Sequence, residues 1–91
     1  MTEYKGFRAD RLKAVMALNE ITVEDVEKYW VEFFKSQGEE TEIEDGSFIK
    51  MFLEKVLNGY YYEPTLLVLF IICDACNCSA DYLLGLSDEI Y

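Results

Sequence analysis

The segment from residue 22 to residue 38 is the part of this sequence that most restricts its fold. Apolar and aromatic residues recur there at three- and four-residue steps, at Val23, Val26, Tyr29, Trp30, Phe33 and Phe34. That spacing places them on one face of an α-helix. Thr22 precedes the series, and Asp25 lies three residues after Thr22, a pattern that resembles a capping box. Gly38 favours the end of the helix. Such a helix must bury its apolar face against other elements.

Four further segments have the features of helices, and none favours a strand. Apolar residues at helical spacing predict helices over residues 8–18, 48–57, 65–76 and 80–84. Residues that favour helix ends separate these segments, at Ser47, Asn58, Gly59, Pro64, Ser79 and Gly85. A chain of 91 residues supports one domain. We therefore expect a single all-α domain of five helices over residues 1–91, with an acidic loop at about residues 37–46.

The charge of the chain is strongly negative and unevenly distributed. Asp and Glu total 18 against 8 Lys and Arg, which gives a net charge of −10. The densest acidic run comprises Glu39, Glu40, Glu42, Glu44 and Asp45. This balance argues against non-specific affinity for nucleic acid. The run is either a solvated face, a nucleic-acid mimic or a contact for a basic protein surface, and its spacing does not fit a calcium-binding loop.

The sequence lacks the residue patterns of several function classes. It has no histidine, no serine-nucleophile motif and no glycine-rich phosphate loop, so we expect neither enzymatic activity nor a cofactor. The longest apolar run, from Leu66 to Cys73, is far shorter than the roughly 20 residues that cross a bilayer. The first residues also lack the apolar stretch of a signal peptide. We therefore expect a cytoplasmic protein that makes no contact with membranes.

Three cysteines lie close together in the sequence, at Cys73, Cys76 and Cys78. Their spacing suits metal chelation, but structural zinc needs four ligands, and the chain has neither a fourth cysteine nor a histidine. An odd number of cysteines also argues against a disulfide framework. We expect the thiols to pack in the core as small hydrophobic groups, without a metal.

Residues 63–85 resemble a family of DNA-binding domains. They are similar to the last two helices of lambda-repressor/Cro-type (XRE-like) helix-turn-helix domains. The similarity begins at Glu63-Pro64-Thr65-Leu66 and ends with the segment from Ser79 to Gly85. Shorter similarities lie upstream, at residues 11–13, 21–26 and 58–59. The resemblance implies a compact five-helix lambda-repressor-like domain with the three thiols at core positions.

Two departures from the family pattern concern the DNA-reading region. The family joins its second and third helices by a tight turn, whereas this chain has the acidic segment there, which would repel phosphate. The family's polar DNA-facing residues correspond to Ile49, Lys50, Met51 and Phe52. Base edges are read by Arg, Asn or Gln, and Lys50 alone among these four carries a hydrogen-bond donor. The resemblance therefore implies the scaffold but not the base-reading set.

Aromatic and apolar residues follow the third predicted helix where the family has basic and polar ones. Tyr60, Tyr61 and Tyr62 replace basic residues, and Leu67 and Ile71 replace solvent-facing Glu and Lys. Leu67 and Ile71 are one helical turn apart, so we expect both on the outer face of their helix. The tyrosines either pack along the edge of the core or form an interface, since Tyr is enriched at binding hot spots.

These features predict a regulatory interaction module that binds another protein through the acidic loop and the aromatic patch. Expected partners are a repressor or a nucleic-acid-binding enzyme, as for a phage or mobile-element antagonist, and the patch also suits a homodimer. The competing hypothesis is a DNA-binding transcriptional regulator of the Cro/repressor family. It would use Lys50, Lys55, Arg8 and Arg11 for phosphate contacts, with Lys5 and Lys13 nearby in sequence.

Overall fold

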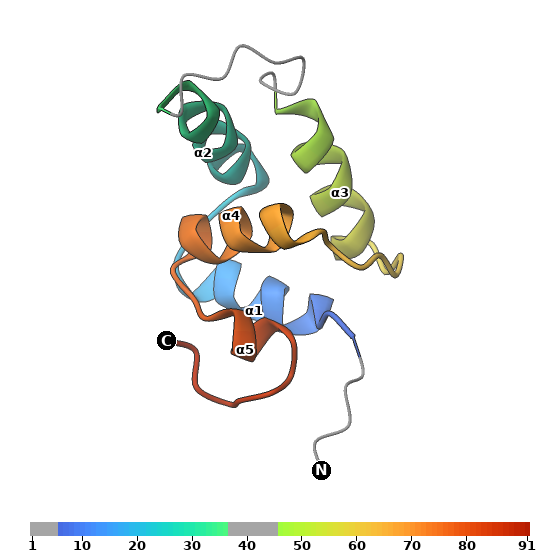
Figure 1. Cartoon of the computed structure of the whole chain (residues 1–91). Helices are drawn as coiled ribbons and strands as arrows, with labels where there is room; N and C mark the ends of the chain where they lie inside the picture. Colours follow the sequence, from blue (N-terminus) through green and yellow to red (C-terminus); the bar gives the residue numbers. More distant parts are fainter. Residues whose placement is uncertain (1–5, 37–45) are drawn as a thin grey trace.

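A computed structural model describes residues 6–36 and 46–91 of the chain. These residues form five helices and no strand: α1 (Ala9–Leu18), α2 (Val23–Ser36), α3 (Ser47–Leu57), α4 (Leu66–Cys76) and α5 (Ala80–Leu83). In Figure 1, α4 crosses the middle of the molecule, with α2 and α3 on one side and α1 and α5 on the other. The prediction of an all-α domain with five helices is confirmed.

Side-chain hydrogen bonds fix the starts of three helices. The predicted capping box of α2 is present, because the Asp25 backbone N–H donates to Thr22 Oγ1 at 3.1 Å and the Thr22 N–H donates to Asp25 Oδ2 at 2.9 Å. The hydroxyls of Thr65 and Ser79 cap α4 and α5, each accepting the backbone N–H three residues further on. The sequence therefore specifies these three helix starts through local chemistry.

The start of α3 differs from the prediction by one residue. Ser47 is the first helical residue, and Gly46 before it is the N-cap, with a φ of 76°. Glycine adopts this left-handed conformation without steric cost. A Cβ at Gly46 would come within 2.6 Å of Glu27 Cγ on α2, so the missing side chain also lets the two helices approach. The predicted end of α3 at Asn58 is confirmed.

The core is built around the apolar face of α2, which both α3 and α4 cover. The buried side chains of these three helices are Val26, Trp30 and Phe34 from α2, Ile49, Leu53 and Val56 from α3, and Val68, Leu69, Ile71, Ile72 and Cys76 from α4. The Trp30 ring lies 5.0 Å from that of Phe34 and 6.0 Å from that of Phe48, measured between centroids. α1 and α5 pack on each other and extend the core beneath α3 and α4.

α4 is apolar on almost every side. Ten of its eleven residues are hydrophobic and Asp74 is the exception, so its sequence does not distinguish an inner from an outer face. Only part of its surface is covered by α2 and α5, and the rest faces outward. Neither α4 nor any other helix within the described residues is long and apolar enough to cross a membrane.

We predict that the capping box contributes measurably to stability. Thr22→Ala should lower the free energy of unfolding by about 1 kcal/mol, because the Asp25 N–H at the start of α2 loses its acceptor. Urea denaturation followed by circular dichroism measures the change. Glu32→Ala, an exposed position further along α2, is the control and should change the free energy by less than about 0.5 kcal/mol. Equal effects of the two substitutions would contradict the capping role.

The same capping box should make stability depend on acid. The hydrogen bond from the Thr22 backbone N–H is the main cause that holds the pKa of Asp25 below its ordinary value. A carboxyl with a lowered pKa stabilises the folded state above its unfolded pKa, about 3.9 for Asp, and this contribution is lost as the pH falls through the folded pKa. Asp25→Asn should therefore be less stable than wild type at neutral pH. The difference in unfolding free energy should shrink below pH ~4, and a constant difference would contradict the account.

Candidate partner-binding surface

The outward face of α3 carries apolar side chains where the resemblance places DNA-reading residues. Phe48 and Met51 are 45% and 50% exposed, Phe52 and Lys50 are half-buried, and Ile49 is fully buried. Ile49 therefore belongs to the core. No Arg, Asn or Gln lies between Ser47 and Leu57, so α3 lacks the planar side chains that read base edges by paired hydrogen bonds.

The prediction for the outer face of α4 is partly wrong. Leu67 is 42% exposed as expected, but Ile71 is completely buried. The side chains that face outward with Leu67 are Leu66, at 84% exposure, and Phe70, at 53%. Because α4 is apolar all round, the family register alone could place Leu67 and Ile71 outside, whereas the packing of the domain buries Ile71 in the core. Leu66 and Phe70 are separated by the same four-residue step as Leu67 and Ile71, so the spacing alone did not distinguish the two faces.

The three tyrosines are all exposed, and two of them have defined contacts. Lys55 Nζ lies 5.6 Å from the centroid of the Tyr62 ring. The Tyr61 hydroxyl donates to Glu63 Oε1, which also accepts the backbone N–H of Phe7 at 3.2 Å. Glu63 thus links Phe7, near the N-terminus, to the segment between α3 and α4. This connection holds Tyr62 beside α3.

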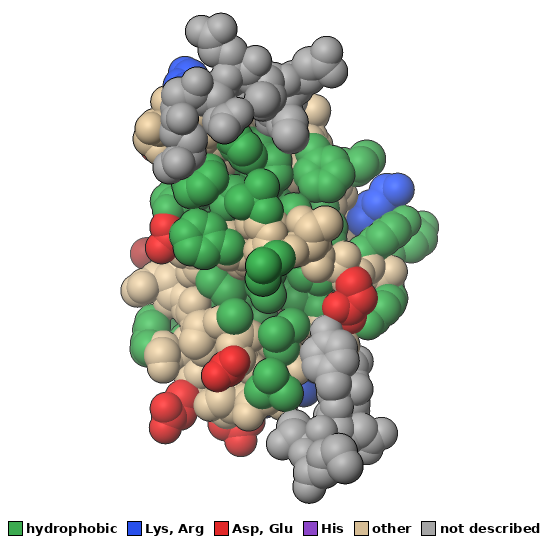
Figure 2. Space-filling model, viewed as in Figure 1, with side chains coloured by type: hydrophobic (Ala, Val, Ile, Leu, Met, Phe, Trp, Pro, Cys, Tyr) green, Lys and Arg blue, Asp and Glu red, His purple; other side chains and the backbone are tan. Residues whose placement is uncertain are grey.

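A groove of about 220 Å³ lies between α3 and the start of α4. We call it the α3–α4 groove, and its lining residues are Phe48, Met51, Phe52, Lys55, Tyr62, Glu63, Pro64, Thr65 and Val68. Figure 2 shows hydrophobic side chains gathered over α4 and the adjoining parts of α2 and α3. Of the tyrosines, Tyr62 is the one that lines the groove, and Leu67 does not line it.

Contacts between aromatic rings connect this apolar surface to α2. Phe48 contacts the buried Trp30, and the exposed Phe70 contacts Phe33 at 5.9 Å between ring centroids. Phe33 in turn meets Phe34 edge-on at 5.4 Å. Phe48 and Phe70 on this surface are therefore both in contact with aromatic rings of α2.

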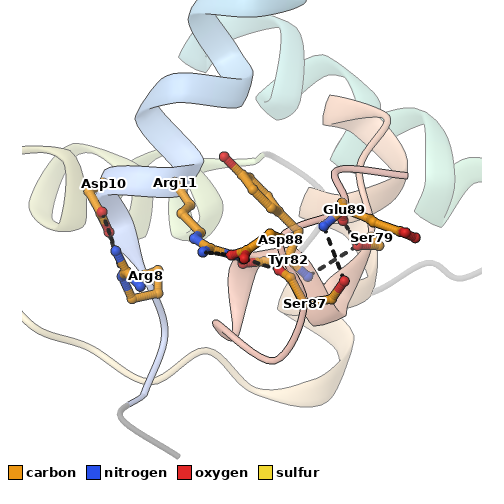
Figure 3. A network of polar contacts seen from close by, with 8 residues as sticks. All are labelled: Arg8, Asp10, Arg11, Ser79, Tyr82, Ser87, Asp88 and Glu89. Atoms are coloured by element: carbon orange, nitrogen blue, oxygen red, sulfur yellow. Dashed lines mark hydrogen bonds and ion pairs between the residues drawn. The ribbon is translucent and has the colours of Figure 1, made fainter.

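Two of the four cationic residues in the DNA-binding hypothesis are engaged within the protein (Figure 3). Arg8 pairs with Asp10 at 2.6 Å, and this hydrogen bond lowers the pKa of the Asp10 carboxyl. The Arg11 guanidinium donates to the carbonyl oxygens of Tyr82 at 3.0 Å and Ser87 at 2.6 Å. It also pairs with Asp88 at 2.6 Å and lies over the Tyr82 ring. Arg11 thus fastens α1 to α5 and the segment after it.

The acidic segment and the cysteines complete the set of predicted sites. Glu39, Glu40, Glu42, Glu44 and Asp45 lie outside the described residues, as does Lys5. Cys76 is fully buried, as predicted for a core thiol, whereas Cys73 and Cys78 are only half-buried. Within residues 6–36 and 46–91, no three or more Cys, Asp or Glu side chains are grouped so that they could hold a metal ion.

Comparisons with known proteins add no assignment: no protein-family model, no curated protein and no solved structure matches this chain. The similarity of residues 63–85 to lambda-repressor/Cro-type domains therefore stays a prediction from the sequence. The arguments about function rest on the surface itself.

We predict that Arg11 has a structural role. Arg11→Ala should lower the free energy of unfolding by about 1–3 kcal/mol, because two carbonyl oxygens lose a charged donor. Lys13→Ala, an exposed position on the same helix, should have little effect. Denaturant titration of both variants measures the difference. If Arg11→Ala is as stable as Lys13→Ala, Arg11 is free for another role such as phosphate contact.

Proposed function

We propose that this domain binds another protein, and that its partner presents a basic segment with apolar side chains to the α3–α4 groove and the outer face of α4. The observation that carries this proposal is the groove lined by Phe48, Met51 and Tyr62, on the helix where a DNA-binding relative would carry polar residues. An intermolecular contact would cover this groove together with Leu66, Leu67 and Phe70, the outer face of α4.

The apolar character of the surface supports binding to protein rather than to nucleic acid. Contiguous exposed apolar patches on soluble domains usually mark contacts with other proteins, and aromatic residues and Met are enriched at the centres of such contacts. Interfaces with DNA are instead polar and strongly positive. On α3, Lys50 and Lys55 are the basic residues, and Lys55 lies over Tyr62.

The charge of the chain supports a basic partner. A net charge of −10 on 91 residues attracts a cationic surface and opposes the close approach of a second copy. The five acids between Glu39 and Asp45, which come shortly after α2 in the sequence, are part of this charge. Long-range attraction speeds the encounter, and burial of apolar side chains then holds the complex. A repressor or a nucleic-acid-binding enzyme has the basic surface that such an encounter requires.

A model partner tests the chemistry before a natural one is identified. We suggest a synthetic helical peptide of leucine and lysine with one apolar and one basic face, added to ¹⁵N-labelled protein. Amide shifts are expected at residues 48–55 and 62–70, and small shifts at α1. Met51→Lys and Phe70→Lys should each weaken binding by roughly tenfold or more, equivalent to about 1.4 kcal/mol.

The controls separate surface recognition from charge alone. Leu18→Lys adds the same charge at an exposed apolar position on α1 and should bind the peptide like wild type. A peptide of the same composition in scrambled order, without an apolar face, should bind at least tenfold more weakly, which corresponds to roughly 1.4 kcal/mol. Equal losses for Met51→Lys and Leu18→Lys would overturn the proposed surface. Dimerisation of the free protein that disappears in Phe70→Lys would assign the surface to a second copy instead.

DNA binding measured over a salt series tests the competing hypothesis. We expect no binding to random or genomic DNA even at low salt, because the chain is acidic. In addition, two of the four basic residues that this hypothesis requires, Arg8 and Arg11, form ion pairs within the protein. Tight binding that falls steeply with salt and weakens in Lys50→Ala would establish the DNA-binding regulator and exclude the proposal.

A further inference from the structure

Cys73 and Cys78 come together because of the way α4 ends. Asn77, which follows the helix, has a φ of 56° in the left-handed region. The Cys78 backbone N–H then donates to the Cys73 carbonyl oxygen at 3.0 Å. This hydrogen bond spans five residues and is the one that closes a Schellman motif, in which the side chains at the two ends of the loop contact each other. In this chain both end residues are cysteines, and their side chains line the same surface pocket.

The three thiols differ in access to solvent. Cys73 and Cys78 are half-buried and line a surface pocket of about 330 Å³, together with Phe70, Asp74, Asn77, Ser79 and Tyr91. Cys76 is completely buried on the inner side of α4. A small polar reagent can therefore reach the first two thiols but not the third.

The two accessible thiols are unequal. The interaction between the side chains of Cys73 and Cys78 is the main cause that lowers the pKa of Cys78 and raises that of Cys73. Burial raises the pKa of the Cys76 thiol to about 12. Because the thiolate is the reactive form of cysteine, Cys78 is the most reactive of the three.

We propose that Cys73 and Cys78 form a dithiol site that reacts with hydrogen peroxide and closes to an intramolecular disulfide. The Cys78 thiolate attacks one peroxide oxygen, the O–O bond breaks, and the leaving hydroxide takes a proton to become water. Cys78 is then a sulfenic acid. The Cys73 sulfur attacks the Cys78 sulfur, the S–O bond breaks, and the hydroxyl leaves as a second water with the Cys73 proton. Two thiols and one peroxide thus give one disulfide and two waters.

The local geometry favours this product over the other outcomes of oxidation. The loop that the disulfide closes is already closed by the hydrogen bond between Cys78 and Cys73, so little chain entropy is lost in bringing the sulfurs together. A reactive, accessible thiol beside a resolving cysteine is the arrangement of redox-sensitive sites. This site is independent of what binds in the α3–α4 groove.

Peptide mapping of the full chain after peroxide treatment tests the proposal. The remaining thiols are blocked with iodoacetamide, and the protein is cleaved on the N-terminal side of aspartates. Cleavage before Asp74 separates Cys73 from the other two cysteines. In wild type and in Cys76→Ala we expect two peptides joined by a disulfide, with a mass two hydrogens lower than the sum of the reduced pair. This product should be lost in Cys73→Ala and in Cys78→Ala.

Trapping the sulfenic acid tests the order of events. In Cys73→Ala, dimedone should label Cys78 in clear excess over Cys76, because Cys78 lines the surface pocket whereas Cys76 is completely buried. Unfolding in guanidinium should abolish this preference. The proposal is overturned if wild type forms a Cys73–Cys76 bond, forms only intermolecular disulfides, or gains oxygen at the sulfurs without closing the bond. Circular dichroism of each variant confirms that the helices are retained.

Discussion

Burial of Trp30 is the constraint on which the rest of this structure depends. Its ring sits between Phe34 on its own helix and Phe48 on α3, and no other part of α2 presents so large an apolar side chain to the core. A helix with this face cannot be covered by one neighbour, and both α3 and α4 pack against it. The positions of those two helices follow from the need to enclose one aromatic stripe.

The exposed surface is a consequence of the same packing. α4 is apolar all round, so burying Ile71 and its neighbours in the core leaves Leu66, Leu67 and Phe70 outside. α3 buries Ile49 and Leu53 and thereby turns Phe48 and Met51 outward. An isolated protein gains nothing from such exposure, whereas a protein with a partner recovers the burial in the complex. The surface therefore has a physical origin in the core, and the proposed function gives it a role in binding.

Much of the fold could be predicted from local chemistry. The Thr22–Asp25 capping box, the Ser79 cap and the end of α3 at Asn58 are all as expected, because each depends on residues within one helical turn. The outer face of α4 could not be predicted in this way. Periodicity has no contrast where nearly every residue is apolar, so the placement of Ile71 depended on the resemblance to the family and was wrong. The contact between Cys73 and Cys78 depends on the left-handed Asn77, which composition and spacing do not specify.

The orientation of α4 is the central claim, because both the binding surface and the correction of Ile71 depend on it. Relaxation of methyl protons by a soluble paramagnetic agent reports this orientation directly in solution. The account predicts strong relaxation of the Leu66 and Leu67 methyls and weak relaxation of the Ile71 methyls, matching their exposure. Strong relaxation of Ile71 together with protection of Leu66 would contradict it, and the apolar surface described for α3 and α4 would not exist.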